Sequence, residues 1–302
     1  MTIEKGEYLK CIICGDGSLV KRLKPFGGTL VKCTECGLVF RNPRPSYETT
    51  REYYKENYSN IFCEEKIKNY REKIFLHFLL DVIKDKGRGR LLDVGCGYGV
   101  FLNLAKNQGW EVFGVELSID ACQFAQNNLG LNVFCGDLKD AAFPKDHFDI
   151  VTLWNVLEHM TNPLEQLLEI KRILRNNSLL FIRLPNFLFQ EKARRIGESF
   201  DRLFLGCTNL SRKISVSHLY AFTPLSISNL LESTGFSTFS VRNAPPAKGD
   251  PYKAFPFLGG ALLTSIKNSL FITCELLYHL SMKKIHWCPS MEVYAYKEVQ
   301  KI

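Results

Sequence analysis

The chain has 302 residues, of which 46% are apolar and 23% are charged, and it carries a formal net charge of +8. This length excludes both a minimal domain and a large multidomain protein, and predicts one catalytic domain with a small accessory module. Ordinary apolar content without repeats excludes a largely disordered chain, while the basic charge favours anionic partners without choosing among nucleic acid, nucleotide-linked sugars and an acidic membrane surface.

The first segment, residues 1–45, contains two cysteine pairs in the pattern C-x₂-C-x₁₈-C-x₂-C. Cys11, Cys14, Cys33 and Cys36 can each supply one thiolate to a tetrahedral zinc ion, which leaves no open position for catalysis. We therefore expect a small zinc ribbon with a structural metal. A redox pair or unrelated buried thiols are the alternatives. Because the start MTIEKGEYLK lacks the apolar core of a signal peptide, we expect a cytoplasmic protein with reduced cysteines.

Residues 46–88 are charged and aromatic, with apolar residues at roughly helical intervals, and predict a helical linker or cap. From residue 89 to the end, apolar runs alternate with helical stretches at about 100–108, 121–128, 163–174 and 225–234. This alternation predicts an α/β fold, a doubly wound and mostly parallel sheet with both faces covered by helices. An insertion at about 245–289 separates the last expected strand, MEVYAYKE, from the one before it.

The strongest catalytic signal is LLDVGCGYG, at the end of the first strand of this domain. Gly95, Gly97 and Gly99 permit a tight turn against which a nucleoside ligand can lie. Their spacing, GxGxG, differs from the GxGxxG that places a pyrophosphate on a helix N-terminus. Asp93, two residues before the first glycine, favours a cationic ligand. S-adenosylmethionine carries a sulfonium and an ammonium and no phosphate, so it suits this turn better than a dinucleotide does.

Two further acids end the next two strands. Glu116 closes EVFGVE, where a carboxylate can accept hydrogen bonds from both hydroxyls of a ribose. Asp137 follows the third strand, where it can accept from the amine of an adenine while Leu138 donates from its backbone. Each acid alone fits a helix N-cap or a solvated turn, but together they predict an adenosine site.

The segments LLDVGCGYG, GVELS, CGDL and FDIVTLWNVLEHM resemble the class I, seven-stranded methyltransferases over roughly residues 90–242. The resemblance implies a Rossmann-like sheet with an antiparallel seventh strand, which MEVYAYKE would supply, and a methionine part of the cofactor near Asn155. The ribbon resembles those ahead of bacterial methyltransferases that are often encoded among polysaccharide and secondary-metabolite pathways. The expected cofactor contacts are Asp93, Gly95, Gly97, Gly99, Glu116, Leu117, Asp137, Leu138 and Asn155.

Three residues are candidates for the catalytic centre. Glu158 and His159 follow the fourth strand, and His218 stands in HLYAFTP before a helix. Methyl transfer is an in-line displacement that needs a general base only for some acceptors. The alternative for these side chains is structural, as capping or packed residues.

The leading functional hypothesis is S-adenosylmethionine-dependent methylation of a small-molecule or sugar-like acceptor on oxygen, nitrogen or carbon. A second is RNA methylation, since residues 21–32 of the ribbon are basic, although no stripe of arginines interleaved with aromatics is evident. A third is an inactive protein that binds the cofactor as a scaffold.

The apolar stretch from Gly259 to Met282 is interrupted by Lys267 and Glu275, which argues against a membrane span. With Lys283 and Lys284 beside it, residues 256–285 predict either an interfacial helix that contacts a membrane peripherally, near a lipid-linked acceptor, or a lid or dimer helix. The sequence leaves the oligomeric state open.

Overall fold

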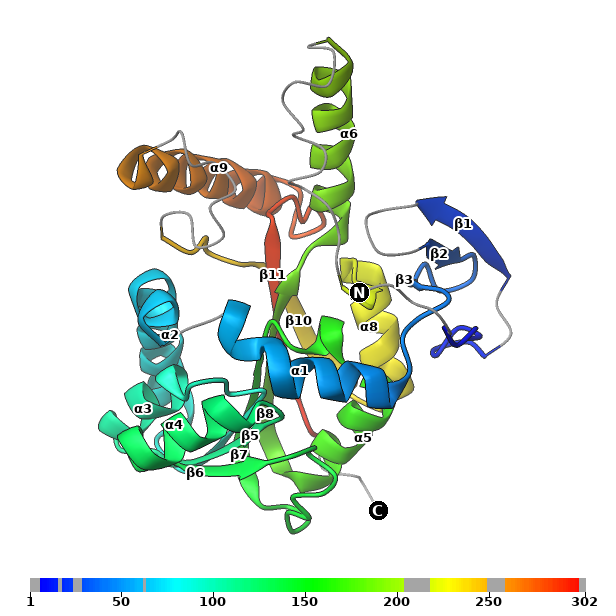
Figure 1. Cartoon of the computed structure of the whole chain (residues 1–302). Coiled ribbons are helices and arrows are strands. Elements are labelled where there is room, and N and C mark those ends of the chain that lie inside the picture. The colour runs from blue at the N-terminus through cyan, green and yellow to red at the C-terminus, as the bar shows by residue number, and fades with distance from the viewer. Residues whose placement is uncertain are drawn as a thin grey trace.

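The computed structural model describes residues 6–15, 18–23, 29–61, 64–203, 218–248 and 259–298, which form two sheets surrounded by helices (Figure 1). The larger sheet has seven strands in the order β10-β11-β8-β7-β4-β5-β6. Only β11 runs antiparallel to its neighbours, β8 and β10. The bounds are β4 Arg90–Val94, β5 Glu111–Glu116, β6 Asn132–Cys135, β7 Phe148–Trp154, β8 Leu174–Pro185, β10 Thr238–Asn243 and β11 Ser290–Tyr296. The predicted doubly wound sheet is therefore confirmed.

Four helices, α3, α4, α5 and α8, begin and end within two residues of the predicted positions, whereas no helix was predicted where η1 and α6 lie. Ser118 caps α4 by accepting from the Ala121 N–H, and Thr223 with Ser226 forms a reciprocal capping box at the start of α8. The bounds are α3 Val100–Asn107, α4 Ile119–Leu129, the 3₁₀ helix η1 Leu157–His159, α5 Pro163–Ile173, α6 Phe187–Leu203, α8 Pro224–Ser233 and α9 Gly260–Leu280. No helix in the described ranges has both the length and the apolar character needed to cross a bilayer.

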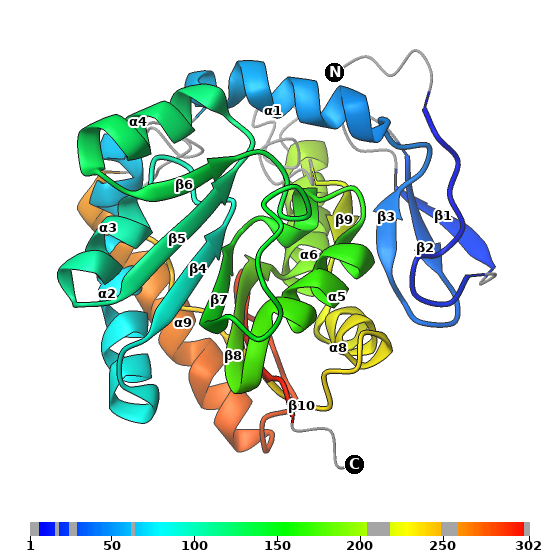
Figure 2. The same cartoon turned by 90° about the horizontal axis from the view of Figure 1, so that it is seen from below.

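The expected helical segment 46–88 forms two helices, α1 Tyr47–Ile61 and α2 Glu64–Lys86. Phe75 and Phe78 of α2 pack edge-on against Trp154 at the end of β7, with ring centroids 4.7 and 5.4 Å apart. Such offset aromatic contacts add to the burial of apolar area. Helix α1 runs from the ribbon to α4, across one end of the large sheet (Figure 2).

The smaller sheet contains the ribbon strands and one strand from the far side of the sequence. Strands β1 Leu19–Leu23, β2 Leu30–Cys33 and β3 Val39–Arg41 pair antiparallel, and β9 Tyr220–Ala221 adds to β3. The Arg44 guanidinium donates to the Tyr220 hydroxyl at 3.0 Å. The ribbon therefore shares its sheet and its core with the segment that carries His218.

Candidate functional site

The glycine turn after β4 has a backbone that only glycine adopts without strain. Gly95, Gly97 and Gly99 have φ angles of 73°, 54° and 75°, in the left-handed region. A Cβ added at Gly95 would lie 2.6 Å from a methyl of Val156. The Gly95 N–H donates to the Val115 carbonyl at 2.7 Å, which ties the turn to β5. The turn thus presents bare backbone at the carboxyl ends of β4 and β5.

Glu116, at the end of β5, organises this turn. Its carboxylate accepts from the backbone N–H of Gly97 at 2.8 Å, Leu117 at 2.8 Å and Ser118 at 2.9 Å. Burial raises the pKa of Glu116, and the three N–H donors oppose that rise. The predicted cofactor residues Gly97, Glu116 and Leu117 are therefore brought together in one hydrogen-bonded unit.

Asp93 lies beneath the turn and is only 2% exposed. Its Oδ1 accepts from the Thr152 hydroxyl at 2.6 Å. Burial raises the pKa of Asp93 to about 8, with a further contribution from the negative charge of Glu116. A cationic ligand over the turn would stabilise the ionised form of both acids, so the site fits the sulfonium and ammonium of S-adenosylmethionine and disfavours a phosphate.

Asp137, the third acid, is bonded to a residue that the sequence did not single out. The Tyr47 hydroxyl at the start of α1 donates to Asp137 Oδ2. Arg51, one turn further along α1, lies 4.0 Å from the carboxylate of Asp140. Burial and the charge of Asp140 raise the pKa of Asp137. Leu138 is buried beside it, so α1 covers the end of the site at which an adenine is expected.

The three candidate catalytic residues converge at the end of β7. One ligand atom from each of Glu158, His159 and His218 lies within 4.8 Å of those of the other two. The two imidazoles meet edge to face with ring centroids 4.8 Å apart. The Glu158 Oε1 accepts from the Asn155 side chain at 3.4 Å, and Asn155 itself has a left-handed φ of 59°. The structure therefore places Asn155 beside the candidate acceptor site.

Glu158 is 1% exposed, and its Oε2 has no hydrogen-bond partner among the described residues. Burial raises the pKa of Glu158 to about 7. Burial and His218 lower the pKa of His159 to about 3, and burial and Arg41 lower that of His218 to about 4. Both imidazoles are thus neutral near pH 7, while Glu158 exchanges its proton there. A base of that pKa is well matched to a neutral operating pH.

Tyr54 of α1 completes this cluster. Its hydroxyl lies 2.8 Å from His159 Nδ1, and the rings stand edge to face. A hydrogen bond at one ring nitrogen fixes the imidazole orientation and the protonation of the other nitrogen. Tyr47 and Tyr54 were both missed from the sequence. The only signal was the repetition of tyrosines in an otherwise charged segment.

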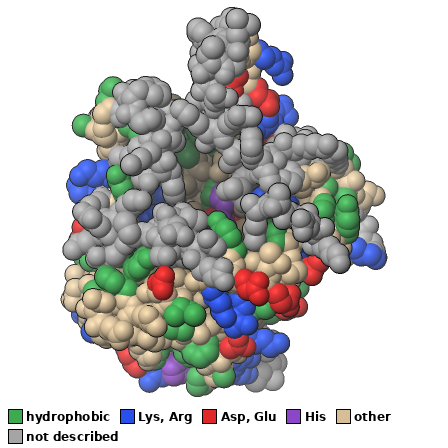
Figure 3. Space-filling model, viewed as in Figure 1, with side chains coloured by type: hydrophobic (Ala, Val, Ile, Leu, Met, Phe, Trp, Pro, Cys, Tyr) green, Lys and Arg blue, Asp and Glu red, His purple; other side chains and the backbone are tan. Residues whose placement is uncertain are grey.

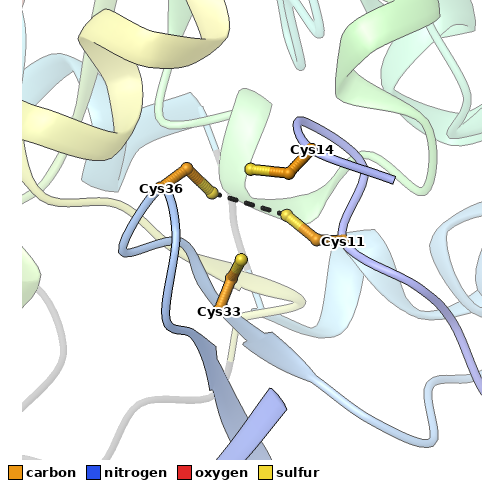
Figure 4. A group of neighbouring side chains, drawn as sticks. All are labelled: Cys11, Cys14, Cys33 and Cys36. Carbon is orange, nitrogen blue, oxygen red and sulfur yellow. Dashed lines mark hydrogen bonds between the residues drawn. The ribbon is translucent and has the colours of Figure 1, made fainter. Parts of the chain in front are cut away.

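The four ribbon cysteines point toward a common centre (Figure 4). Their sulfur atoms lie within 4.8 Å of one another, and Cys11 Sγ and Cys36 Sγ are 3.4 Å apart. Zinc–sulfur bonds of about 2.3 Å in a tetrahedron require sulfur separations of about 3.8 Å, so the donor set fits a closed zinc site. The Cys36 carbonyl accepts from the Asn229 side chain of α8 at 3.1 Å.

The RNA hypothesis depends on the basic segment 21–32, most of whose side chains lie outside the described part of the structure. On the face drawn in Figure 3, acidic and basic side chains of the described residues stand side by side rather than in a stripe of one sign. That face offers no continuous path for a phosphate backbone within the described residues.

A methyltransferase domain family matches residues 65–241 of the chain. The ubiquinone biosynthesis O-methyltransferase of Glaesserella parasuis is 34% identical over 118 residues, covering 34% of this chain and 50% of that protein. The protein of the same name from Coxiella burnetii is 26% identical over 176 residues, covering 56% of this chain and 75% of that protein. The chain thus matches about half the length of the G. parasuis protein.

Solved structures show the same fold. A SAM-dependent methyltransferase from Archaeoglobus fulgidus superposes with a TM-score of 0.50 at 22% identity, over 78% of this chain and 97% of that one. A phosphoethanolamine N-methyltransferase from Haemonchus contortus, in complex with S-adenosyl-L-methionine, gives a TM-score of 0.50 at 18% identity, over 86% of this chain and 62% of that one.

Proposed function

Because the chain belongs to the methyltransferase domain family, and is thus an S-adenosylmethionine-dependent methyltransferase, we propose that it methylates an oxygen atom of a small-molecule acceptor. Two relatives are named as O-methyltransferases of ubiquinone biosynthesis, which favours oxygen over nitrogen or carbon. The observation that carries the proposal is the buried Glu158 carboxylate near the end of β7, whose Oε2 accepts no hydrogen bond from any described residue. A hydroxyl acceptor needs such a group to take its proton.

The cofactor half of the proposal assigns roles to the strand-end residues. Gly95, Gly97 and Gly99 give the methyl donor access to bare backbone, and Asp93 offsets its positive charge. Glu116 holds the turn through the Gly97 N–H and, with the one lone pair left on Oε2, accepts from a ribose hydroxyl. Asp137 Oδ1 accepts from the adenine amine, because Tyr47 engages only Oδ2. Leu117, Leu138 and Asn155 complete the set.

The acceptor half depends on proton transfer. S-adenosylmethionine supplies an electrophilic methyl carbon, to which the acceptor oxygen bonds as the carbon–sulfur bond breaks and S-adenosylhomocysteine leaves. Glu158 takes the hydroxyl proton on Oε2, the oxygen to which no described residue donates a hydrogen bond. His159 and His218 stay neutral and orient the acceptor by hydrogen bonds. Tyr54 fixes the ring of His159 from α1.

For the domain organisation, we propose a zinc ribbon over residues 1–45, a cap over 46–88 and a catalytic domain over 89–302. Zinc held by Cys11, Cys14, Cys33 and Cys36 would be structural, since all four positions are filled by sulfur. The pairing of β3 with β9 ties this ribbon to the segment of His218. The ribbon therefore helps to shape the acceptor site, which suits a bulky acceptor such as a sugar or a lipid-linked molecule.

The test is turnover with a methyl-labelled donor. Purified, zinc-loaded protein is incubated with labelled S-adenosylmethionine and fractionated extract of its own cell, and S-adenosylhomocysteine and labelled products are measured. We expect label in a small molecule as a methoxy group, identified by its carbon chemical shift. Label in RNA would support the RNA hypothesis instead. Cofactor binding without any turnover would support the scaffold hypothesis.

A further inference from the structure

Helix α9, in the insertion before the last strand, presents its most apolar face to solvent. Leu263, Cys274 and Tyr278 are buried, and the helix packs against β10. Six large apolar side chains on the other side are between 37% and 81% exposed. They are Leu262, Ile266, Leu270, Ile272, Leu276 and Leu280, which we call the α9 face. At 100° per residue they fall within an arc of roughly 160°, which is the pattern of an amphipathic helix turned outward.

Six large apolar side chains share this face, with the small polar residues Ser265, Ser269 and Thr273 among them. Single exposed leucines need no explanation, but a contiguous apolar patch on a monomer marks a contact with a partner or a membrane. Figure 1 shows α9 at the periphery of the molecule. With 21 residues, the helix is about 31 Å long at 1.5 Å per residue. Only three of its side chains are buried, so it lies along the surface.

The charges next to the α9 face are basic. The helix carries one acid, Glu275, whose carboxylate accepts from the Asn243 side chain at 2.9 Å and lies 3.9 Å from His279. The chain then continues into Lys283 and Lys284, both exposed. An apolar helix face followed by two exposed lysines complements an anionic lipid surface, to which each juxtamembrane lysine adds attraction.

A tryptophan and a cavity lie at the same end of the helix. Trp287 is 45% exposed, with the Lys192 ammonium of α6 4.3 Å from its ring centroid. Indole rings favour the interface between water and lipid. A cavity of about 740 Å³ opens here, lined by Lys283, Lys284 and His286, by Lys32 of β2 and Glu191 of α6, and by apolar and hydroxyl residues of α6, α8 and β10. The His286 Nδ1 is buried and has no hydrogen-bond partner among the described residues.

We propose that the α9 face docks on an anionic phospholipid bilayer, with the helix parallel to the surface and its leucines and isoleucines at the boundary of headgroups and acyl chains. Lys283 and Lys284 contact lipid phosphates, and the cavity beneath them receives a headgroup. Docking would bring the enzyme to an acceptor held in or at the membrane. That last consequence rests on the proposed function, whereas the docking itself does not.

Vesicle sedimentation tests the docking with the full chain. We expect binding to vesicles of phosphatidylcholine mixed with phosphatidylglycerol, weak binding to phosphatidylcholine alone, and a loss of binding as salt is raised. The double variant Ile272→Gln/Leu276→Gln should lower the partition coefficient by about tenfold or more, because two large apolar side chains no longer enter the interface. Lys283→Glu/Lys284→Glu should lower it by about tenfold on anionic vesicles only.

The matched control is Leu80→Gln/Lys139→Glu, which changes an exposed leucine and an exposed lysine away from α9 and should bind like the wild type. Fluorescence gives a second readout. Trp110 and Trp154 are buried, so a blue shift on adding vesicles reports Trp287, and Trp287→Phe should abolish it.

Two outcomes overturn the proposal. One is a monomer that binds no vesicle. The other is a dimer without lipid that Ile272→Gln/Leu276→Gln converts to a monomer, since the α9 face would then join two copies. Turnover of a soluble acceptor is measured for every variant and should not change. A wild-type protein that turns over the soluble acceptor but binds no vesicle refutes only this inference. A wild-type protein that binds vesicles but does not turn over refutes only the proposed function.

Discussion

Replacing Glu158 with glutamine tests the proposed base, because the amide keeps the shape of the side chain and removes its titration. General bases contribute about 10²- to 10⁴-fold to a rate, so kcat should fall by that factor while the KM for S-adenosylmethionine stays near the wild-type value. The wild-type rate should rise with pH through about 7, as Glu158 loses its proton, and this rise should be absent from the variant.

The same variant should be more stable than the wild type at high pH. The pKa of Glu158 is about 7 in the folded protein and 4.5 for a free glutamate. A raised acid pKa means that the folded state binds the proton more tightly, so wild-type stability falls as the pH rises from about 4.5 to 7. At about 1.4 kcal/mol for each pKa unit, the loss is about 3 kcal/mol.

Glutamine escapes this loss, so the difference in melting temperature between Glu158→Gln and wild type should be near zero at pH 4 and should grow up to pH 8. Glu232→Gln, on an exposed part of α8, is the control and should show no trend. A variant that turns over at more than half the wild-type rate, or a stability difference that is the same at both pH values, would refute the assignment of Glu158.

Three further predictions concern the cysteine cluster, the hydrogen bond to His159 and the cofactor site. Cys33→Ser should lower the zinc content measured by mass spectrometry from one per chain to none and lower the melting temperature, whereas Cys135→Ser, at an exposed cysteine, should keep the zinc; equal zinc in both would contradict the ribbon site. Tyr54→Phe should reduce kcat/KM by about fivefold, which corresponds to the loss of one hydrogen bond of about 1 kcal/mol, and circular dichroism should show an unchanged fold. An unchanged kcat/KM would show that the hydrogen bond of Tyr54 to His159 does not contribute to turnover. Cofactor binding at pH 7 should release a proton, because the pKa of Asp93 is about 8 before the cation binds and falls when it binds. Calorimetry in buffers of different ionisation enthalpy measures this release. Binding heats that do not depend on the buffer, or that depend on it equally in Asp93→Asn, would contradict the prediction.

The sequence predicted the parts of the fold and site that depend on local spacing. The alternation of apolar runs and helices gave the parallel sheet, and GxGxG after a strand gave the turn, whose left-handed glycines are a property of a few consecutive residues. Glu116 and Asp137 could be placed because successive parallel strands end at one edge of the sheet. The sequence predicted only that His159 and His218 lie at the same edge of the sheet. The structure places their rings in contact.

Contacts between distant segments could not be predicted in this way. Tyr47 meets Asp137 across 90 residues, and Thr152 meets Asp93 across 59. Neither pair has a sequence pattern, because the path of α1 over the sheet is decided by tertiary packing. The addition of β9 to the ribbon sheet was equally invisible, since a two-residue strand has no periodicity. Whether the α9 stretch is a lid or an outward-facing helix also depended on which of its sides is buried.

The position of α1 connects the ribbon to both ends of the site. Tyr47 and Tyr54 are seven residues apart, two helical turns or about 10.5 Å, so they lie on one face of the helix. One bonds Asp137, at the expected adenine end, and the other bonds His159, at the expected acceptor end. The ribbon leads directly into α1, and its strand β3 holds β9 beside His218. A ribbon that loosens must therefore displace α1 and His218 together, so we expect loss of zinc to weaken cofactor binding and turnover in parallel, although none of the four ribbon cysteines is among the proposed cofactor or acceptor contacts.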